Sequence, residues 1–534
     1  MATATERGSA GAGTVPRRAS LVLLALIVVA AVANLNLTVA NVALPAIGRA
    51  FGTGQTTLDL IALGYSLGLA GSVLYLGAVG DRYGRRMMLI LGVLLSVPAC
   101  LMAAFAPDAG LLLAGRLLGG ISAGMAYPTT LALITALWSG PARIRAIALW
   151  SGIGGAITAL GPMLAGLIMQ HFWWGSAFLL TLPLAAVALV LAVACVPSHV
   201  NETTDPVDHL GGVLSMVFVA GLVVTINFAA VPGAGTLALG TGIVALAAGA
   251  GFFLRQRRAR PPLYDLHVAG RRIFWVAAVG GIIVFGSLMG AIFVGQQYLQ
   301  DVLGYSPLSA GLAILPAAVC MVASAPLSAR LGQARGSGFA LLTGYLFCLF
   351  SFLTMLLGWK EGSSYWVVGL AFAFLGTGVG LAGTPASHSL TSSVPTRRAG
   401  MASGTADLQR DLGGAIMQSI LGALLTAGYA AAIARSVASA PDRSRITGSV
   451  QGQLQKSFAG AEQVAQRYPQ YATKITAAAK NAFLAGDQWA YAAAIIGVLL
   501  GAALVFALFP RPAAEAALLA RYQTEDRRQA PRPG

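Results

Sequence analysis

Apolar runs of about twenty residues follow one another from Leu21 almost to the end of the chain. A helix of that length crosses the ~30 Å hydrocarbon core of a bilayer. We distinguish about fourteen such runs. The first six lie near 20–46, 57–79, 87–106, 110–133, 145–170 and 176–197, the next two near 210–230 and 235–254, and the last six near 273–297, 309–329, 337–359, 365–390, 400–430 and 488–509. The pattern predicts an all-α integral membrane protein.

The runs form two groups of six separated by one pair, and repeated helical halves are typical of secondary transporters. The domain organisation follows from this grouping. We expect an N-terminal tail (1–19), an N-terminal six-helix bundle (20–197), an inserted two-helix pair with flanking loops (198–271), a C-terminal six-helix bundle (272–509) with one long outer loop (431–487), and a C-terminal tail (510–534).

Composition excludes several classes of protein. Hydrophobic residues make up 57% of the chain and charged residues 10%, whereas a soluble domain has about 25% charged residues. The four cysteines lie singly in separate apolar runs, without metal-binding or redox spacing. No Walker A, HExxH or nucleophile-elbow motif is present. We therefore expect neither an enzyme nor a bound metal or organic cofactor.

Basic residues outnumber acidic ones, 34 to 18, and lie in short gaps between the apolar runs. Clusters of this kind mark cytoplasmic loops, and no basic stripe with interleaved aromatic residues indicates nucleic-acid binding. The marked segments are Arg17–Arg18, Arg82/Arg85/Arg86, Arg143/Arg145, Arg255–Arg260, Arg271–Arg272, Arg330/Arg335, Arg397–Arg398 and the tail arginines. Both termini are thus predicted to be cytoplasmic, although segment 198–209 is acidic instead of basic.

Two segments allow more than one interpretation. Arg17–Arg18 before an apolar run resembles a twin-arginine signal, but the run continues to Ala46, which favours a first transmembrane helix. In the long outer loop, residues 457–466 and 472–484 have the pattern of short amphipathic helices at the membrane surface. The simpler alternative for the loop is a solvated hairpin without substrate contact.

A dense charge cluster, Gly77-Ala-Val-Gly-Asp81-Arg82-Tyr-Gly84-Arg85-Arg86, lies between the second and third runs. The glycines allow two helix ends to approach closely. Asp81 offers a carboxylate to an arginine, and the basic side chains can bond the C-terminal carbonyls of a neighbouring helix. We interpret the loop as a conformational latch between two bundles, and a merely positive-inside loop is the alternative.

This loop resembles the G-x-x-x-D-R-x-G-R-R motif of the major facilitator superfamily. Three further segments resemble signatures of its fourteen-helix drug:proton antiporter family. They are Leu35-Asn36-Leu-Thr38-Val-Ala-Asn41-Val-Ala-Leu-Pro45, Gln297-Tyr298-Leu-Gln300 with Gly304-Tyr-Ser-Pro307, and Arg398-Ala-Gly-Met-Ala-Ser-Gly404. The resemblance implies a major facilitator fold, export of a small amphiphilic molecule and a proton gradient as energy source.

In the fifth run, Gly161-Pro162 followed by Gly166 resembles the antiporter motif G-P-x-x-G-G of the superfamily. Proline removes a backbone hydrogen bond and bends the helix, and glycines permit close packing. The resemblance implies export, while a purely structural kink is the alternative.

Arg116 lies inside the fourth apolar run, where a charge is costly and usually functional. Counting residues along the two helices places it at the same depth as Asn36, in the outer half of the N-terminal bundle. The family pattern has an acid at the position of Asn36 and relays protons between it and the arginine. Asparagine does not titrate, so the proton must bind elsewhere or coupling is lost.

Asp407 and Asp411 share one helix face, and Arg410 is within reach of Asp407. Two carboxylates that share one arginine near the membrane midplane are not both ionised cheaply, so one is expected to hold a proton. An internally neutralised ion cluster is the alternative. Asp59 is a further coupling candidate, although its place near a helix end favours a solvated cap.

Polar and aromatic residues predict the substrate cavity. Aromatic faces suit flat amphiphiles and cations, although each ring alone is more often a packing residue. The cavity candidates are Asn34, Asn36, Thr38, Asn41, Tyr127, Gln297 and Tyr298, with Tyr65, Trp150 and Phe285 as further aromatic residues.

The sequence thus predicts a multi-pass transporter of the bacterial plasma membrane. We expect a functional monomer that exports amphiphilic drugs, with protons as the coupled ion and the lipid bilayer as its surroundings. The alternatives are an exporter of an endogenous metabolite or lipid, and a non-transporting membrane sensor or partner protein.

Overall fold

The computed structural model describes residues 19–138, 140–198, 206–229, 234–260, 262–395, 399–440, 443 and 446–529. Several sequence predictions fall outside these ranges. They concern Arg17–Arg18, Arg397–Arg398, most of segment 198–205 and the last residues of the C-terminal tail.

Every secondary-structure element of the described residues is a helix. The first half contains α1 (Ala19–Phe51), α2 (Gln55–Tyr83), α3 (Arg85–Ala104), α4 (Ala109–Leu137), α5 (Gly140–Met169), α6 (Ser176–Leu179) and α7 (Thr181–Cys195). The following segment contains α8 (His209–Ala229), α9 (Gly235–Arg258) and the short α10 (Leu266–Ala269). The second half contains α11 (Arg272–Gln297), the π-helix η1 (Tyr298–Val302), α12 (Pro307–Leu312), α13 (Leu315–Arg335), α14 (Ser337–Gly358), α15 (Tyr365–Ser392), α16 (Ala399–Ala438), α17 (Gly448–Lys456), α18 (Phe458–Arg467), the 3-10 turn η4 (Pro469–Tyr471), α19 (Ala472–Leu508) and α20 (Pro512–Gln529).

Thirteen helices of the described residues are long and apolar enough to cross a membrane. Helix α5 is not among the thirteen: it has 30 residues, but it contributes only a shorter apolar segment, Leu160–Met169. With α5 as a further long helix, the arrangement agrees with the expected all-α membrane protein. Large apolar side chains such as Leu246, Trp366 and Phe506 are mostly exposed, as a lipid-facing surface requires.

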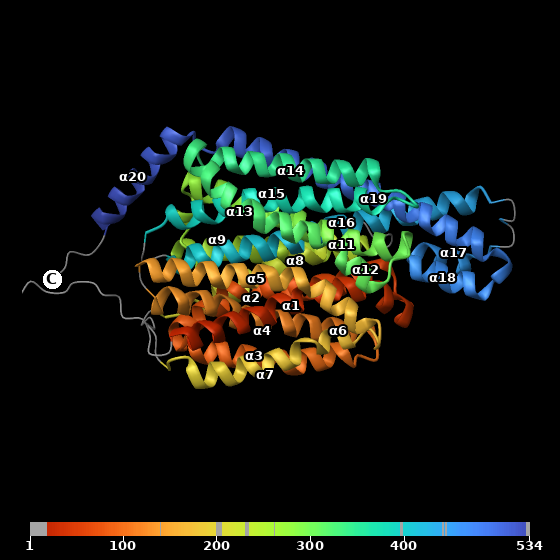
Figure 1. The fold of residues 1–534 in the computed structure, drawn as a ribbon, viewed down its shortest axis with the longest axis horizontal. Helices are drawn as coiled ribbons and strands as arrows, with labels where there is room; N and C mark the ends of the chain where they lie inside the picture. Colours follow the sequence, from red (N-terminus) through yellow and green to blue (C-terminus); the bar gives the residue numbers. More distant parts are fainter. Residues whose placement is uncertain are drawn as a thin grey trace, which may run out of the picture.

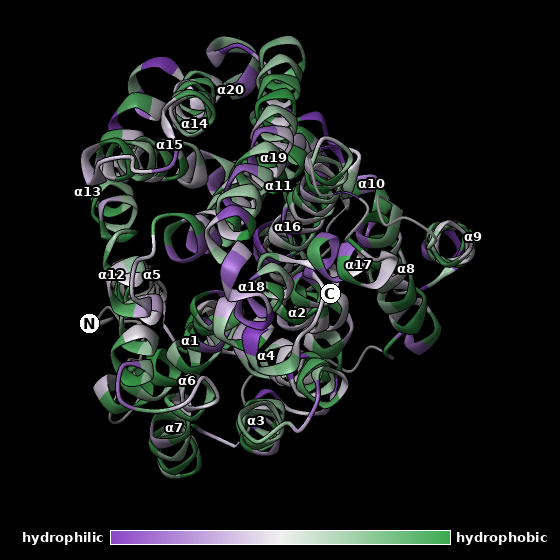
Figure 2. Ribbon diagram, turned by 90° about the vertical axis from the view of Figure 1, so that its right-hand side faces the viewer, coloured by the Kyte–Doolittle hydropathy of each residue, from purple (hydrophilic) through white to green (hydrophobic). Residues whose placement is uncertain are grey.

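The long helices run side by side along one axis, with α17 and α18 beyond one end of the bundle and α20 at the other (Figure 1). We call the end at α17 and α18 the capped end, and these two helices the cap. Helix α8 packs on α2 and α16, and α9 packs on α8 at the edge of the bundle (Figure 2). The pair α8–α9 is therefore peripheral.

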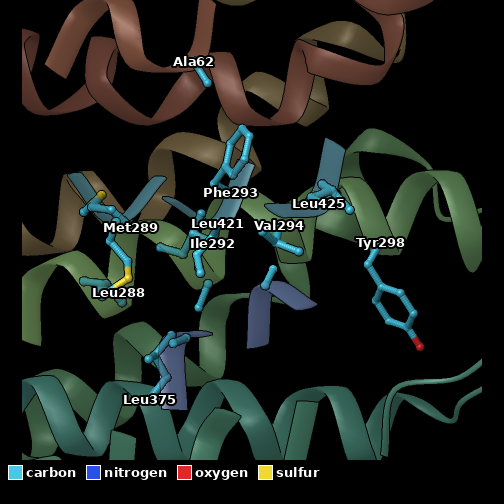
Figure 3. Packing of buried hydrophobic residues seen from close by; sticks show 14 of the residues in the cluster. Ala62, Leu288, Met289, Ile292, Phe293, Val294, Tyr298, Leu375, Leu421 and Leu425 are labelled. Carbon is cyan, nitrogen blue, oxygen red and sulfur yellow. The ribbon is translucent and has the colours of Figure 1, made fainter. Parts of the chain in front are cut away.

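Helix α11 carries the centre of the largest hydrophobic cluster (Figure 3). Phe293 is fully buried and points from α11 toward Ala62 of α2, so the two halves share this core. Contacts of α2 with α16, of α5 with α12 and of α1 with α11 also join the halves. Two repeated bundles that pack through a few central helices form an arrangement suited to rocking.

The segment expected to be a long loop is largely helical. Helix α16 continues to Ala438 and α19 begins at Ala472, which gives them 40 and 37 residues. At ~1.5 Å per residue both are far longer than a ~30 Å hydrocarbon core, so both project beyond it. The predicted helix at 457–466 is present as α18, but residues 472–484 are the first part of α19 and not a separate surface helix.

The interpretation of this segment as a merely solvated hairpin is wrong. Phe458, Ala461 and Val464 of α18 are buried. Lys456 Nζ donates to the carbonyl of Gly52 at 2.6 Å, and Ser457 Oγ donates to the carbonyl of Thr53 at 3.0 Å. The cap is thus bonded to the turn between α1 and α2, over the middle of the bundle (Figure 2).

Candidate functional site

Arg116 of α4 is buried, with 2% of its surface exposed. Its Nη1 donates to the carbonyl of Asn36 at 2.6 Å and its Nε to the carbonyl of Ile61 at 3.3 Å. The guanidinium carbon also lies 4.9 Å from the ring centroid of Tyr65 and 5.7 Å from that of Phe178. Carbonyl oxygens and aromatic faces solvate this cation, and no described carboxylate forms an ion pair with it.

Asn36 lies next to Arg116, as the residue count predicted, but the contact is through its backbone. Its side-chain Nδ2 donates to the carbonyl of Val32 at 3.2 Å. Its Oδ1 accepts from Thr181 Oγ1 at 3.2 Å and from Cys100 Sγ at 3.5 Å. The amide therefore joins α1 to α3 and α7, and it does not bond the guanidinium.

We call Asp407, Arg410 and Asp411 the α16 triad. Arg410 Nη2 lies 3.8 Å from Asp407 Oδ1, and Arg410 Nε lies 3.6 Å from Asp411 Oδ1. Both carboxyl groups are buried, whereas the arginine side chain is 28% exposed. Asp407 Oδ2 and both oxygens of Asp411 have no hydrogen-bond partner among the described residues. The structure thus brings together the three side chains that the spacing predicted.

The α16 triad faces the other half of the molecule. The Arg410 guanidinium lies 4.9 Å from the ring centroid of Tyr127 on α4. Tyr127 packs against Trp150 of α5 with ring centroids 5.4 Å apart, and Trp150 Nε1 donates to Thr130 Oγ1 at 3.0 Å. A change of charge in the triad therefore alters the electrostatic contact between α16 and α4, which belong to different halves.

Asp59 is buried, with 1% exposure, so the prediction of a solvated cap is wrong. Gln55 Nε2 donates to Asp59 Oδ1 at 3.1 Å and to Gln297 Oε1 at 2.6 Å. Thr426 Oγ1 donates to Asp59 Oδ2 at 3.2 Å. These four residues, the Asp59 network, join α2 of the first half to α11 and α16 of the second near the capped end.

Among the cavity candidates, Tyr298 faces away from the interface between the halves. Its hydroxyl donates to the carbonyl of Lys360 at 2.8 Å, and its ring stacks on Trp359 with centroids 4.6 Å apart. Thr38 donates to backbone carbonyls of its own helix and packs against Gly161, so it fills the contact between α1 and α5. Both side chains are packing residues in this conformation.

Asn34 and Asn41 are buried on α1, together with Gln297 in the Asp59 network. Phe285 packs at the edge of the main hydrophobic cluster. The polar stripe on the first helix is thus present, although its middle residue is used for helix packing.

The predicted kink motif lies where the two halves meet. Pro162 is inside α5, and a Cβ on Gly166 would lie 2.5 Å from the carbonyl oxygen of Pro307 on α12. In turn, a Cβ on Gly311 would lie 2.6 Å from the carbonyl oxygen of Pro162. Only glycine permits this close approach, so the motif serves the contact between halves as well as the bend.

The predicted latch lies at the end opposite the cap. Arg85 Nε pairs with Asp81 Oδ1 at 2.8 Å, and Arg86 Nη2 donates to the carbonyl of Val193 on α7 at 2.6 Å. Gly84 has a φ of 125°, which requires glycine, whereas a Cβ on Gly77 would meet open space. The explanation by close helix approach is therefore wrong for Gly77. Arg82 completes the basic end of α2.

Sequence reasoning missed one buried carboxylate, Asp487 of α19. It is 2% exposed, and neither of its oxygens has a hydrogen-bond partner among the described residues. It directly precedes the last predicted apolar run, so the count assigned it to the loop. The sequence feature that could have identified it is its position between a segment of helical pattern and an apolar run, which indicates one continuous helix.

Comparisons with known proteins identify the family of the chain. The sequence model described as Major Facilitator Superfamily matches residues 26–418. Multidrug efflux pump LfrA of Mycolicibacterium smegmatis is 32% identical over 513 residues, which cover 96% of this chain and 100% of that protein. Multidrug resistance protein Stp of Mycobacterium tuberculosis is 31% identical and covers 75% of this chain and 74% of its own length. Methyl viologen resistance protein SmvA of Salmonella typhimurium is 30% identical, with coverages of 77% and 84%.

Solved transporters share the fold. A bacterial homologue of the human lysosomal transporter Spinster, in an inward-facing and unoccupied conformation, gives a TM-score of 0.61 at 16% identity and covers 95% of this chain and 98% of its own. The peptide transporter POT in complex with sulfate gives 0.62 at 14% identity, with coverages of 95% and 97%. The chain therefore belongs to the major facilitator superfamily, a family of transporters and not of enzymes, and to its drug:proton antiporters, as the motifs indicated.

Proposed function

We propose that this protein exports amphiphilic drugs or related compounds, organic cations included, by alternating access and proton antiport. Among relatives of about one-third identity, one is named a multidrug efflux pump, one a multidrug resistance protein, and one a methyl viologen resistance protein. The proposed location is the bacterial plasma membrane, and the proposed functional unit is a monomer.

The observation that carries the proton part is the α16 triad. Its single arginine faces two buried carboxyl groups, three of whose oxygens have no hydrogen-bond partner among the described residues. An uncompensated charge in a low-dielectric site is costly, so a proton on one carboxyl group is favoured. Cationic cargo that approaches the triad neutralises the same charge and displaces that proton, which is the exchange that antiport requires.

The triad also offers a route from proton binding to movement. When both carboxylates are ionised they compete for Arg410, which otherwise lies over the ring of Tyr127 on the opposite half. Protonation frees the guanidinium to strengthen that contact across the interface. Proton occupancy thereby biases how tightly α16 holds α4.

Orientation follows from the basic loops. Arg82 at the end of α2 and Arg85 and Arg86 at the start of α3 lie far from the cap, and Arg255–Arg258 end α9. Short basic loops face the cytoplasm, so the capped end faces outward and both termini lie inside. The Asp59 network joins the halves at the outward end, as expected of a state closed to the outside, and opening would expose Asp59 to protons there.

Transport in energised everted vesicles tests the proposal. An acridine-type pH dye reports the proton gradient while lipophilic cations and neutral amphiphiles are added one by one. We expect some compounds to collapse the gradient only when the protein is present. Asp407→Asn and Asp411→Asn should each abolish or strongly reduce this response at wild-type expression, with Glu525→Gln in exposed α20 as the control.

Three other outcomes would count against the proposal. Labelled compound that moves without proton flux would show that coupling is lost because asparagine replaces the acid of the family pattern at position 36. Unchanged proton flux in both aspartate variants would remove the α16 triad from the mechanism. Movement of lipids or metabolites but of no drug would favour the endogenous cargo.

A further inference from the structure

A further buried acid lies in the C-terminal half, apart from the two acids of the α16 triad. Asp487 of α19 is 2% exposed, and both carboxyl oxygens lack a hydrogen-bond partner among the described residues. No described cation forms an ion pair with it. A bare carboxylate in such a place is strongly destabilising, so the group must be neutral or must be neutralised by a ligand.

Other titratable groups lie near Asp487 on its own helix and on η1. Tyr491 is one turn further along α19, and Tyr298 and Asp301 belong to η1; all three are within electrostatic reach. Tyr429 of α16 and Glu462 of α18 lie within electrostatic reach of each other and of Asp301. Asp301 is the charged group that acts on Asp487, and its negative charge makes an ionised Asp487 still less favourable.

The neighbouring cations are already engaged. Arg49 pairs with Glu462 at 2.8 Å and with Asp301 at 3.6 Å. Lys480, two turns before Asp487 on α19, pairs with Glu361 at 3.2 Å. Neither forms an ion pair with Asp487.

The site has donors but little room. The hydroxyl of Tyr491, the hydroxyl of Tyr429 and Nε1 of Trp359 are all buried without a partner among the described residues. Trp359 stacks on Tyr298 and meets the Tyr491 ring edge-on, with centroids 5.8 Å apart. A Cβ on Gly428 would lie 2.7 Å from Cα of Gly486, so α16 and α19 touch here. An aromatic enclosure this closely packed has no space for an organic cation, whereas a proton needs no volume.

The backbone next to this site is irregular. Residues Tyr298–Val302 form a π-helix directly after α11, and such segments are frequently found at functional sites. The π-helix carries Tyr298 toward Trp359 and places Asp301 opposite Arg49 at the capped end. Asp301 is 10% exposed and Glu462 32% exposed, so acidic groups lead from the surface toward Asp487.

We propose that Asp487 is a second proton-binding site of the transporter, loaded from the capped end and emptied once per cycle. One proton from the aqueous phase converts the carboxylate to a neutral acid, and its release restores the charge. The neutral acid is the form that fits the closed packing seen here. Ionisation would favour separation of α19 from η1, because Asp301 then repels Asp487. The coupling role rests on the proposed proton antiport, but the protonation itself does not.

Infrared spectroscopy of the purified protein in lipid tests the protonation without any transport. The wild type should show, at neutral pH, a carboxylic acid C=O band that Asp487→Asn lacks and Glu361→Gln retains. Identical spectra of wild type and Asp487→Asn would overturn the proposal. If Asp487→Asn fails to fold, Asp301→Asn serves instead. As the pH is raised, the acid band of Asp487 should then disappear at a lower pH than in the wild type, because the repelling charge of Asp301 is gone.

The proton-to-cargo ratio in reconstituted vesicles tests the role in the cycle. Asp487→Asn should move about one proton fewer per cargo molecule than the wild type, the capacity of a single carboxyl group. A protonated Asp487 with an unchanged ratio would overturn the coupling role. A wild type that transports cargo without protons would instead refute the proposed antiport, while the band assigned to Asp487 remained.

Discussion

The two halves of the molecule each bury a charge-bearing group without a counter-ion, and the two groups differ in sign. Arg116 in the first half is a cation without a paired carboxylate, and Asp487 in the second half is an acid without a paired cation. The cation is solvated by two carbonyl oxygens and two rings. No donor among the described residues forms a hydrogen bond with the acid.

This difference reflects what each group can do with a proton. A guanidinium keeps its charge in a protein, so burying it requires oxygens and aromatic faces that remain in place. A carboxyl group can lose its charge by binding a proton and therefore tolerates a site where no group donates a hydrogen bond to it. With asparagine at position 36, the first half has no acid beside its arginine, and the proposed proton binding falls to acids on α2, α16 and α19.

The α16 triad lies between these extremes, since it holds both signs. The largest effect is therefore expected where removal of a cation leaves two acids behind. Arg410→Gln should destabilise the protein by about 3–5 kcal/mol, because Asp407 and Asp411 would then be buried without a cation. Thermal unfolding in detergent at neutral pH measures this effect.

The effect of Arg410→Gln should shrink at acidic pH, where protons replace the arginine. Arg410→Lys is the matched control, since it retains the charge and should recover most of the stability. Equal unfolding temperatures for wild type and Arg410→Gln at neutral pH would show that the triad is neutral without its arginine.

Removing the solitary charges should have opposite consequences in the two halves. Arg116→Gln leaves the carbonyls of Asn36 and Ile61 without their charged donor and should cost about 1–3 kcal/mol. Asp487→Asn removes no observed hydrogen bond and should leave the unfolding temperature unchanged or higher. Arg116→Lys, which keeps one donor to the carbonyls, is the control. A loss of stability in Asp487→Asn as large as in Arg116→Gln would contradict the comparison.

The helical architecture could be predicted from the sequence because it depends on local composition. Runs of apolar residues long enough to span hydrocarbon locate the helices, and i,i+4 spacing alone brings Asp407 and Asp411 to one arginine. The depth shared by Asn36 and Arg116 also followed from a rise per residue.

Contacts between distant segments could not be predicted in this way. Asp59 is near the end of its helix, yet Gln55, Gln297 and Thr426 surround it because the second half packs over that end. Asp487 was assigned to a loop because α19 continues outward beyond the apolar run. Both errors have one cause: hydropathy locates the hydrocarbon boundary, and burial of side chains by protein extends past it.

The smallest effect is expected at an ion pair close to the surface, which gives the reference for a charge that has its partner. Asp208, just before α8, accepts from Arg255 Nε at 3.0 Å and from the amide of Gly211 at 3.1 Å. Burial opposes ionisation, but these hydrogen bonds outweigh it and hold the pKa of Asp208 below its ordinary value. A carboxyl group whose pKa is lowered by folding stabilises the protein at pH values above its ordinary pKa. This contribution disappears as the pH falls through the lowered pKa.

Asp208→Asn should therefore lower the unfolding temperature slightly at neutral pH, by the equivalent of ~1 kcal/mol or less, because Arg255 is 44% exposed and water screens the pair. The difference from wild type should narrow as the pH falls, in contrast to any effect of Asp487→Asn, whose group is proposed to be neutral already. Glu525→Gln, which breaks the exposed pair with Arg521, should change nothing measurable. A constant difference across pH would show that the Asp208 carboxyl group acts through its shape and hydrogen bonds and not through its charge. The presence of a nearby cation would then not be enough to tell which buried acids of this protein are charged.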